Sequence, residues 1–197
     1  MAALALSFHG NIGHPAITKL RNAICTAVNE RVPDQTGRPT TTPKYDTLFL
    51  LMNSGGGALD DGLSLHNMLK SIPLKVTTVN MGFIASIAIL PFLAGETRLA
   101  VPNSSFHFHS FEWNYPGAHT LTRQQFADHT QILDAQRAHT TDILKSATHL
   151  TDADLEQLHL LAQPSIRDVA FAKARGIVHD VRPFALPAGT PLFNVDY

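Results

Sequence analysis

The segment 47–57, Thr47-Leu48-Phe49-Leu50-Leu51-Met52-Asn53-Ser54-Gly55-Gly56-Gly57, decides the fold of this chain. Its first six residues form an apolar run without the polar alternation of a sheet that has one wet face. Such a run is typical of a central parallel strand that is covered on both faces. A glycine turn follows, and helical periodicity comes next over residues 59–72. The segment therefore predicts a strand, a tight turn and a helix.

The same alternation extends to both sides of this unit. A strand is predicted at residues 4–9, followed by a helix from Pro15 to about Arg31. Residues 33–43 are rich in Pro, Thr and Gly and predict an exposed loop. A β-branched strand at 75–80 and a buried helix of small residues at 85–93 come after the central unit. This order indicates an α/β fold of βαβ units with right-handed crossovers.

The second half of the chain predicts a long polar helix that projects from the body, over residues 121–149. Residues 182–197 are rich in Pro and predict an extended tail. The remaining elements are short strands expected at 98–100, 105–109 and 177–181, a helix that opens at Thr151, and a helix at 167–175.

Composition narrows the class of protein. With 197 residues, of which 44% are hydrophobic, the chain suits a single domain, 1–197. A net charge of -1 with scattered Lys and Arg predicts no nucleic-acid partner and no anionic membrane surface. The longest apolar stretch, 81–94, is too short and too interrupted to cross a membrane. The single Cys25 excludes an intrachain disulfide and, among apolar neighbours, is predicted to be buried. We expect a cytoplasmic protein.

Three short segments lie where predicted strands end, the place where α/β sheets build their sites. They are N-S-G-G-G at 53–57, G-F-I-A-S-I at 82–87 and P-N-S-S-F-H-F-H at 102–109. Ser86 opens a buried helix, whose terminus favours a developing negative charge. The glycines let a backbone approach a ligand and direct N–H groups at it, as an oxyanion hole requires. Taken one by one, each segment also has a structural explanation, as a packing serine, a turn or a core histidine.

In order and spacing, these segments resemble the Clp protease proteolytic subunit family. The pattern of that family is N-S-P-G-G, G-x-A-S-M, A-G and P-N-S-x-x-x-x-H, and Ala94-Gly95 supplies the third block here. Residues 10–28 and 168–180 resemble the first and last parts of the family's chain. The resemblance implies a ClpP/crotonase-like spiral of βαβ units with a protruding handle helix, here within about 112–149. It also implies a serine-type endopeptidase.

Position by position, the resemblance makes Ser86 the nucleophile and His109, rather than His107, the general base. The family's third catalytic residue is an Asp, and the matching region here reads Gln163-Pro164-Ser165. Asp168 is the nearest carboxylate, and it also suits the N-cap of the next helix. The third position is therefore open between Gln163, Ser165, Asp168 and a backbone group, and a Ser-His dyad of low activity is an alternative.

The remaining site residues lie in the glycine turn and after the serine. By resemblance, the backbone N–H groups of Gly57 and Ile87 form the oxyanion hole, and Gly55 and Gly56 contact the substrate. Gly55 stands where the family has Pro, and Ile87 where it has Met. Since the oxyanion contact is made by backbone, both changes are compatible with the role.

The resemblance implies a peptide or unfolded-protein substrate, no cofactor, and a homo-oligomer that could be stacked rings. An AAA+ unfoldase is left open as a partner, because the first strand begins close to Met1 and leaves little room for the family's axial loops. Eleven His residues raise the question of a metal, but there is no H-E-x-x-H or C-x-x-C, so none is expected. Two alternatives are a catalytically silent ClpP-like scaffold subunit and a crotonase-like acyl-CoA enzyme.

Overall fold

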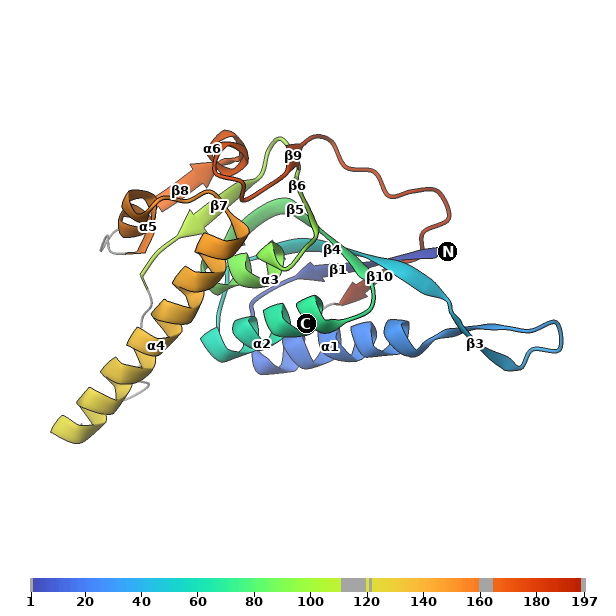
Figure 1. Cartoon of the computed structure of the whole chain (residues 1–197), viewed down its shortest axis with the longest axis horizontal. Coiled ribbons are helices and arrows are strands. Elements are labelled where there is room, and N and C mark those ends of the chain that lie inside the picture. The colour runs from blue at the N-terminus through green and yellow to red at the C-terminus, as the bar shows by residue number, and fades with distance from the viewer. Residues whose placement is uncertain (1, 111–119, 121, 160–164, 196–197) are drawn as a thin grey trace.

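The computed structural model describes residues 2–110, 120, 122–159 and 165–195, and for residues 158 and 159 only the backbone. The described strands form one eight-stranded, mostly parallel sheet flanked by helices (Figure 1). The predicted α/β fold is confirmed. Along the sheet the order is β10 (Leu192–Val195), β1 (Ala2–His9), β4 (Tyr45–Ser54), β5 (Lys75–Ala85), β6 (Thr97–Ala100) and β9 (Asp180–Val181).

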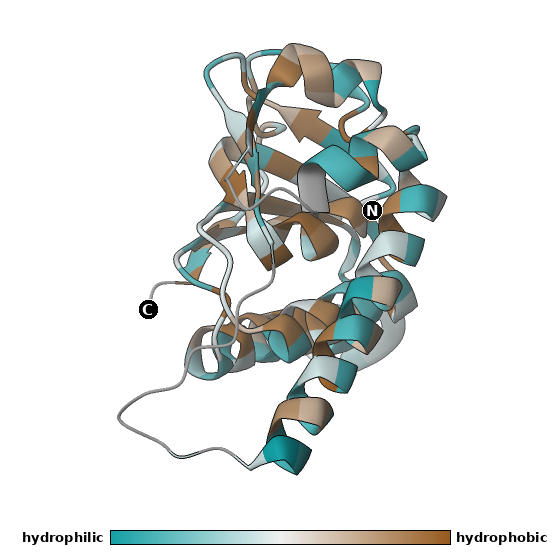
Figure 2. Ribbon diagram, turned by 90° about the vertical axis from the view of Figure 1, so that its left-hand side faces the viewer, coloured by the Kyte–Doolittle hydropathy of each residue, from teal (hydrophilic) through white to brown (hydrophobic). Residues whose placement is uncertain are grey.

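The two faces of this sheet are covered differently. On one face, α1 (His14–Asn29) and α2 (Leu59–Ser71) lie side by side and bury the main hydrophobic core (Figure 1). On the other face, Leu51, Val79 and Leu99 are packed under Phe184 and Leu186 of the C-terminal tail. Figure 2 shows hydrophobic, brown segments on the strands and, alternating with hydrophilic teal, on the helices. The central strand is therefore buried on both faces, as its apolar run predicts.

The end of β5 positions the candidate site. From Thr77 to Asn80 the strand pairs with β6, and from Phe83 to Ala85 it pairs with β7 (Ser105–Phe108). Two asparagine side chains form hydrogen bonds at the point where β5 changes its pairing partner from β6 to β7. Asn80 Nδ2 donates to Ser105 O at 2.9 Å, and Phe83 N donates to Asn53 Oδ1 at 2.9 Å. The expected helix at 85–93 begins as a 3-10 turn, Ser86–Ala88, and continues as α3, Ile89–Leu93.

Residues beyond the central unit form a second layer near β7. The long helix α4 (Arg123–Ala147) begins at the capping residue Thr122 and projects from the body (Figure 1). Helix α5 (Asp152–His159) follows it, and then β8 (Ser165–Asp168), which pairs antiparallel with β7, and α6 (Val169–Ala174). Among the described residues, no helix combines the length and the apolar content that crossing a bilayer requires.

Two local expectations, the loop at 33–43 and the buried Cys25, are wrong. The predicted loop at 33–43 forms a hairpin of β2 (Arg31–Pro33) and β3 (Pro39–Pro43), because the Asp34 carboxylate accepts hydrogen bonds from the backbone of Thr36 and Arg38 and closes the turn. The predicted extended tail ends in a strand, β10, which pairs with β1. Cys25 is exposed, because α1 turns Ile24 and Ala27 to the core and places Cys25 outside.

We predict that Gly57→Ala destabilises the fold. Gly57 has φ +147, and a Cβ there would lie 2.0 Å from Ile12 O, so the free energy of unfolding should fall by about 2 kcal/mol or more. Gly55→Ala, in the same turn, is the control, because its Cβ would meet only Asn11 Oδ1 at 3.4 Å. Urea unfolding of both variants checks this. Equal losses in the two variants would contradict it.

Candidate active site

Ser86 occupies a strained position directly after β5. Its φ is +54, and it is the only non-glycine residue in the described part of the chain with a positive φ. Such a backbone costs about 1 to 3 kcal/mol and persists only where the surroundings impose it. Here Ala85 is held by its pairing with β7, while the next side chain, Ile87, is buried against Gly62 of α2. The chain therefore turns sharply between two fixed neighbours.

The glycine turn after β4 lies against this serine. A Cβ on Gly56 would lie 2.6 Å from Ser86 Cβ and 3.2 Å from Ser86 Oγ. Gly57 comes next and forms a bridge with Ile12, whose carbonyl accepts a hydrogen bond from Ala58 N at 2.7 Å. The structure thus brings two of the three segments together, and only glycine fits beside the serine.

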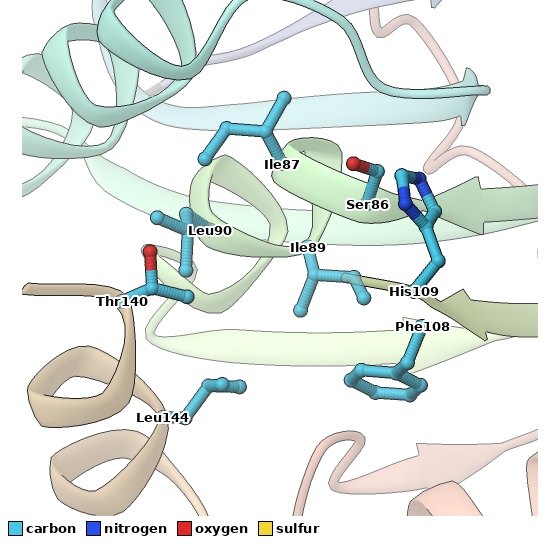
Figure 3. A pocket seen from close by; sticks show the side chains of 8 residues that line it. All are labelled: Ser86, Ile87, Ile89, Leu90, Phe108, His109, Thr140 and Leu144. Carbon is cyan, nitrogen blue, oxygen red and sulfur yellow. The ribbon is translucent and has the colours of Figure 1, made fainter. Parts of the chain in front are cut away.

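The third segment reaches the site through the pairing of β5 and β7. Because Ala85 is the register partner of His107, the residues that follow each of them lie at the same edge of the sheet. Ser86 and His109 line one pocket, and Figure 3 shows the imidazole of His109 beside Ser86. The parallel pairing explains how residues 23 positions apart in the sequence (109 − 86) come together. In the described part of the chain no hydrogen bond joins them, which is common in resting enzymes.

The hydrogen bond of His109 selects its tautomer. Its Nδ1 lies 2.7 Å from Ser110 O. A carbonyl oxygen can only accept, so Nδ1 carries the proton and Nε2 of the neutral ring is left as an acceptor. In this state the imidazole can take a proton from a hydroxyl. The backbone carbonyl of Ser110 orients the imidazole of His109. A backbone group is one of the candidates that the sequence leaves open for the third position of the triad.

His107 has a different environment. Its ring packs against Phe83, with centroids 5.7 Å apart, and among the described residues its buried Nε2 has no hydrogen-bond partner. Burial lowers the pKa of His107 below its ordinary value, and the neighbouring His109 lowers it further. The pocket is lined by His109 and not by His107. These contacts fit a structural histidine.

The register between β7 and β8 decides where Asp168 lies. Asp168 is the partner of Ser105, four positions before His109, which at about 3.3 Å per residue is roughly 13 Å along the strand. Its Oδ1 accepts from Phe171 N at 2.8 Å and so caps α6. Ser165 is the partner of Phe108. Gln163 and Pro164 lie outside the described residues. The structure brings Ser86, Ile87 and His109 to one pocket, places Gly56 against Ser86, and leaves Asp168 apart.

The walls of the pocket are apolar. They come from the helix after the serine, from β7 and from α4, and none of the lining side chains is an acid, a lysine or an arginine. Leu90 is held in place by His66 of α2, whose Nδ1 donates to Leu90 O at 2.7 Å. Burial lowers the pKa of His66, so the ring stays neutral in this role. Thr140 also lines the pocket, and nothing in the sequence distinguishes it from Thr141.

Over the described residues, no group of three or more His, Cys, Asp or Glu side chains could hold a metal ion.

Known proteins are similar to this chain in sequence and in structure. The family model described as Clp protease matches residues 19–182. The ATP-dependent Clp protease proteolytic subunit 3 of Rhizobium meliloti is 39% identical over 66 residues, which are 32% of this chain and 34% of that protein. Subunit 2 of Borreliella burgdorferi is 38% identical over 64 residues, 32% of each chain. The matched region thus spans about a third of these curated relatives.

A solved structure extends the likeness to most of the fold. A mutant of ClpP1 from Listeria monocytogenes superposes with a TM-score of 0.68 at 20% identity and covers 90% of both chains. At that identity the likeness concerns the fold. The resemblance that the sequence blocks indicate is confirmed by the family model, which covers more than half of the chain. The chain belongs to the Clp protease family.

Proposed function

We propose that this chain is a serine-type endopeptidase that hydrolyses peptide bonds of short peptides or unfolded proteins. The observation that carries the proposal is the meeting of a strained serine and a histidine of fixed tautomer in one pocket. A nucleophile and a base in this relation are what acyl transfer requires. The family membership agrees with this reaction class.

The steps follow from the atoms at hand. Ser86 Oγ attacks the scissile carbonyl carbon while His109 Nε2 takes the hydroxyl proton. The backbone N–H groups of Gly57 and Ile87 stabilise the oxyanion, and a donor of this kind is worth about 3 to 4 kcal/mol in well-studied enzymes. His109 then returns the proton to the leaving amine, and water hydrolyses the ester on Ser86. Gly55 and Gly56 flank the substrate, and at Gly56 a side chain would collide with the serine.

Ser110 O acts in place of the missing carboxylate. The 2.7 Å hydrogen bond holds the ring and its tautomer, which is one part of what an Asp does in a triad. A neutral carbonyl stabilises the imidazolium less than a carboxylate does. We therefore expect a working but slow centre, a Ser-His pair oriented by backbone.

The two alternatives leave observations unexplained. A crotonase-like acyl-CoA enzyme would use the glycine turn but has no use for a serine in a strained position beside a histidine. A silent scaffold subunit would account for the absent Asp but not for a strained serine that lies beside a histidine in one pocket. The silent scaffold is the stronger of the two, and labelling of the serine separates it from the peptidase.

The surface of α4 supports a further part of the proposal, that the chain forms a homo-oligomer that could be stacked rings. Only Thr140 and Leu144 are buried in this 25-residue helix, whereas Phe126 is 59% exposed and Ile132 is 43% exposed. Large apolar side chains on a projecting helix are costly in water and favour a protein contact. A second copy of the chain is the partner that the family membership favours.

The first prediction concerns the nucleophile. A fluorophosphonate probe should add to the wild type once, and Ser86→Ala and His109→Ala should abolish the adduct, as read by intact mass. Ser104→Ala and His107→Gln are the controls, and both should label as the wild type does. An unlabelled wild type that is folded would reject the peptidase and favour the silent scaffold.

A second prediction separates Asp168 from the catalytic centre. Asp168→Ala removes the cap of α6 and should lower the free energy of unfolding by about 1 kcal/mol, while Asp168→Asn keeps an acceptor and most of that stability. Both variants should label at the wild-type rate, because Asp168 lies away from His109 in the strand register. Loss of labelling in a folded Asp168→Asn protein would restore Asp168 as the third catalytic residue.

A third prediction concerns assembly. Native mass spectrometry of the wild type should show an oligomer, and the double variant Phe126→Glu, Ile132→Glu should shift it to smaller species, because two charges would be buried in the contact. The double variant Gln131→Glu, Ala138→Glu adds the same charge at other exposed positions of α4 and should keep the wild-type mass. A monomeric wild type would contradict the prediction, as would equal effects of the two double variants.

A further inference from the structure

The short helix that follows Ser86 depends on its neighbours for its position. Helix α3 has five residues, whereas an isolated helix shorter than about 12 residues is marginal in water. Pro91, in the middle of α3, supplies no backbone N–H to the preceding turn. All the side chains of the helix are buried. The direction in which the chain leaves the nucleophile is therefore set by contacts with other elements.

Two buried side chains donate hydrogen bonds to carbonyl groups of α3. His66 Nδ1, from α2, donates to Leu90 O at 2.7 Å, and Thr78 Oγ1, from β5, donates to Phe92 O at 2.7 Å. Since a carbonyl oxygen can only accept, the ring of His66 carries its proton on Nδ1. The helix is thus fixed from two sides, once by α2 and once by the sheet.

Helix α2 holds the segment after the nucleophile at two points. Gly62 and His66 are four residues apart and are both buried on the same face of α2. Ile87 packs against Gly62, where an added Cβ would collide with the isoleucine side chain. Leu90 is bonded to His66 one turn further along. The residue directly after Ser86 and a residue that lines the pocket are therefore held by one helix face.

The two anchors of α3 differ in their distance along the chain from the nucleophile. Leu90 is closer to Ser86 and lines the same pocket, whereas Phe92 lies further on and packs against Phe106 in the core. The positive φ of Ser86 persists only where its surroundings impose it. Loss of the bond at Leu90 would let residues 86–90 relax while Thr78 still holds the far end of the helix.

We propose that His66 is a positioning residue of the site, which holds Ser86 and the backbone N–H of Ile87 in their reactive arrangement through its hydrogen bond to Leu90. This inference rests on the proposed peptidase function and adds to it a residue on a helix behind the pocket. His66 touches no reacting atom and takes no proton in the reaction. Its contribution is to keep the turn after β5 in the strained form that presents the nucleophile.

The test compares the rates at which a fluorophosphonate probe labels Ser86 in the wild type and in variants of His66. His66→Phe keeps a ring without a donor, and labelling should slow about tenfold, the factor that corresponds to one ordinary hydrogen bond. In His66→Asn the amide nitrogen is bonded to Cγ, as Nδ1 is in histidine, so this variant should recover most of the rate. In His66→Gln the amide lies one bond further out, and labelling should be as slow as in His66→Phe.

Thr78→Val is the matched control for these variants. It removes a hydrogen bond of the same length to the same helix and preserves the shape of the side chain. Urea unfolding should show a loss of stability in both Thr78→Val and His66→Phe, whereas only His66→Phe should label slowly. The rates are measured without urea, on samples that circular dichroism shows to be folded.

The outcomes separate this inference from the function beneath it. If the wild type labels and His66→Phe labels equally fast, the role of His66 alone is wrong. Equal slowing in His66→Phe and Thr78→Val would also overturn it, because the bond would then only stabilise the helix. If His66→Phe does not fold, equal rates in His66→Asn and His66→Gln would reject the positioning role. A folded wild type that does not label would overturn the peptidase, and the inference with it.

Discussion

The side-chain amides of Asn53 and Asn80 hydrogen-bond the backbone where β5 leaves β6 and joins β7, and the candidate site depends on that change of neighbour. Without it, Ala85 would not face His107 and the histidine that follows could not reach Ser86. The same bend brings Ser86 against the glycine turn after β4, where Gly56 leaves no room for a side chain. Hydrogen bonds from two asparagine side chains at the end of one strand thus position Ser86, His109 and the glycine turn close together.

Among the residues that the structure describes, His109 is oriented by a backbone carbonyl and by no carboxylate. The Ser110 carbonyl sets the tautomer through a short bond, so geometry is preserved while electrostatic stabilisation of the imidazolium is weaker. The apolar lining of the pocket strengthens what electrostatics remain, because a charge that develops there is poorly screened. In the function that we propose, a centre of this kind keeps the order of events of a triad at a lower rate.

The local sequence pattern predicts the strands and turns that meet at the candidate site. It does not predict features that depend on pairing between segments far apart in the sequence. The apolar run at 47–52 and the glycine turn specify a buried strand and its end, whereas Ser86 and His109 are singled out by the order and spacing of the blocks that resemble the Clp protease family. The place of Asp168 depends on the register of β7 with β8, which no local pattern encodes. For the same reason the sequence does not predict the pairing of β10 with β1. The sequence also does not show which of Thr140 and Thr141 is buried, because the buried face of a polar helix depends on the elements that pack against it.

Helix α4 links the pocket to the surface of the molecule. Near its C-terminal end it is fixed to the body, with Leu144 in the core and the Ala147 carbonyl accepting from the buried Arg98 guanidinium at 2.8 Å. Gln136 adds a bond to Asp60 of α2 at 2.9 Å. The preceding turns carry the exposed Phe126 and Ile132 and have few contacts of their own. One wall of the pocket therefore belongs to a helix that is fixed to the body near its C-terminal end and exposed along its first turns.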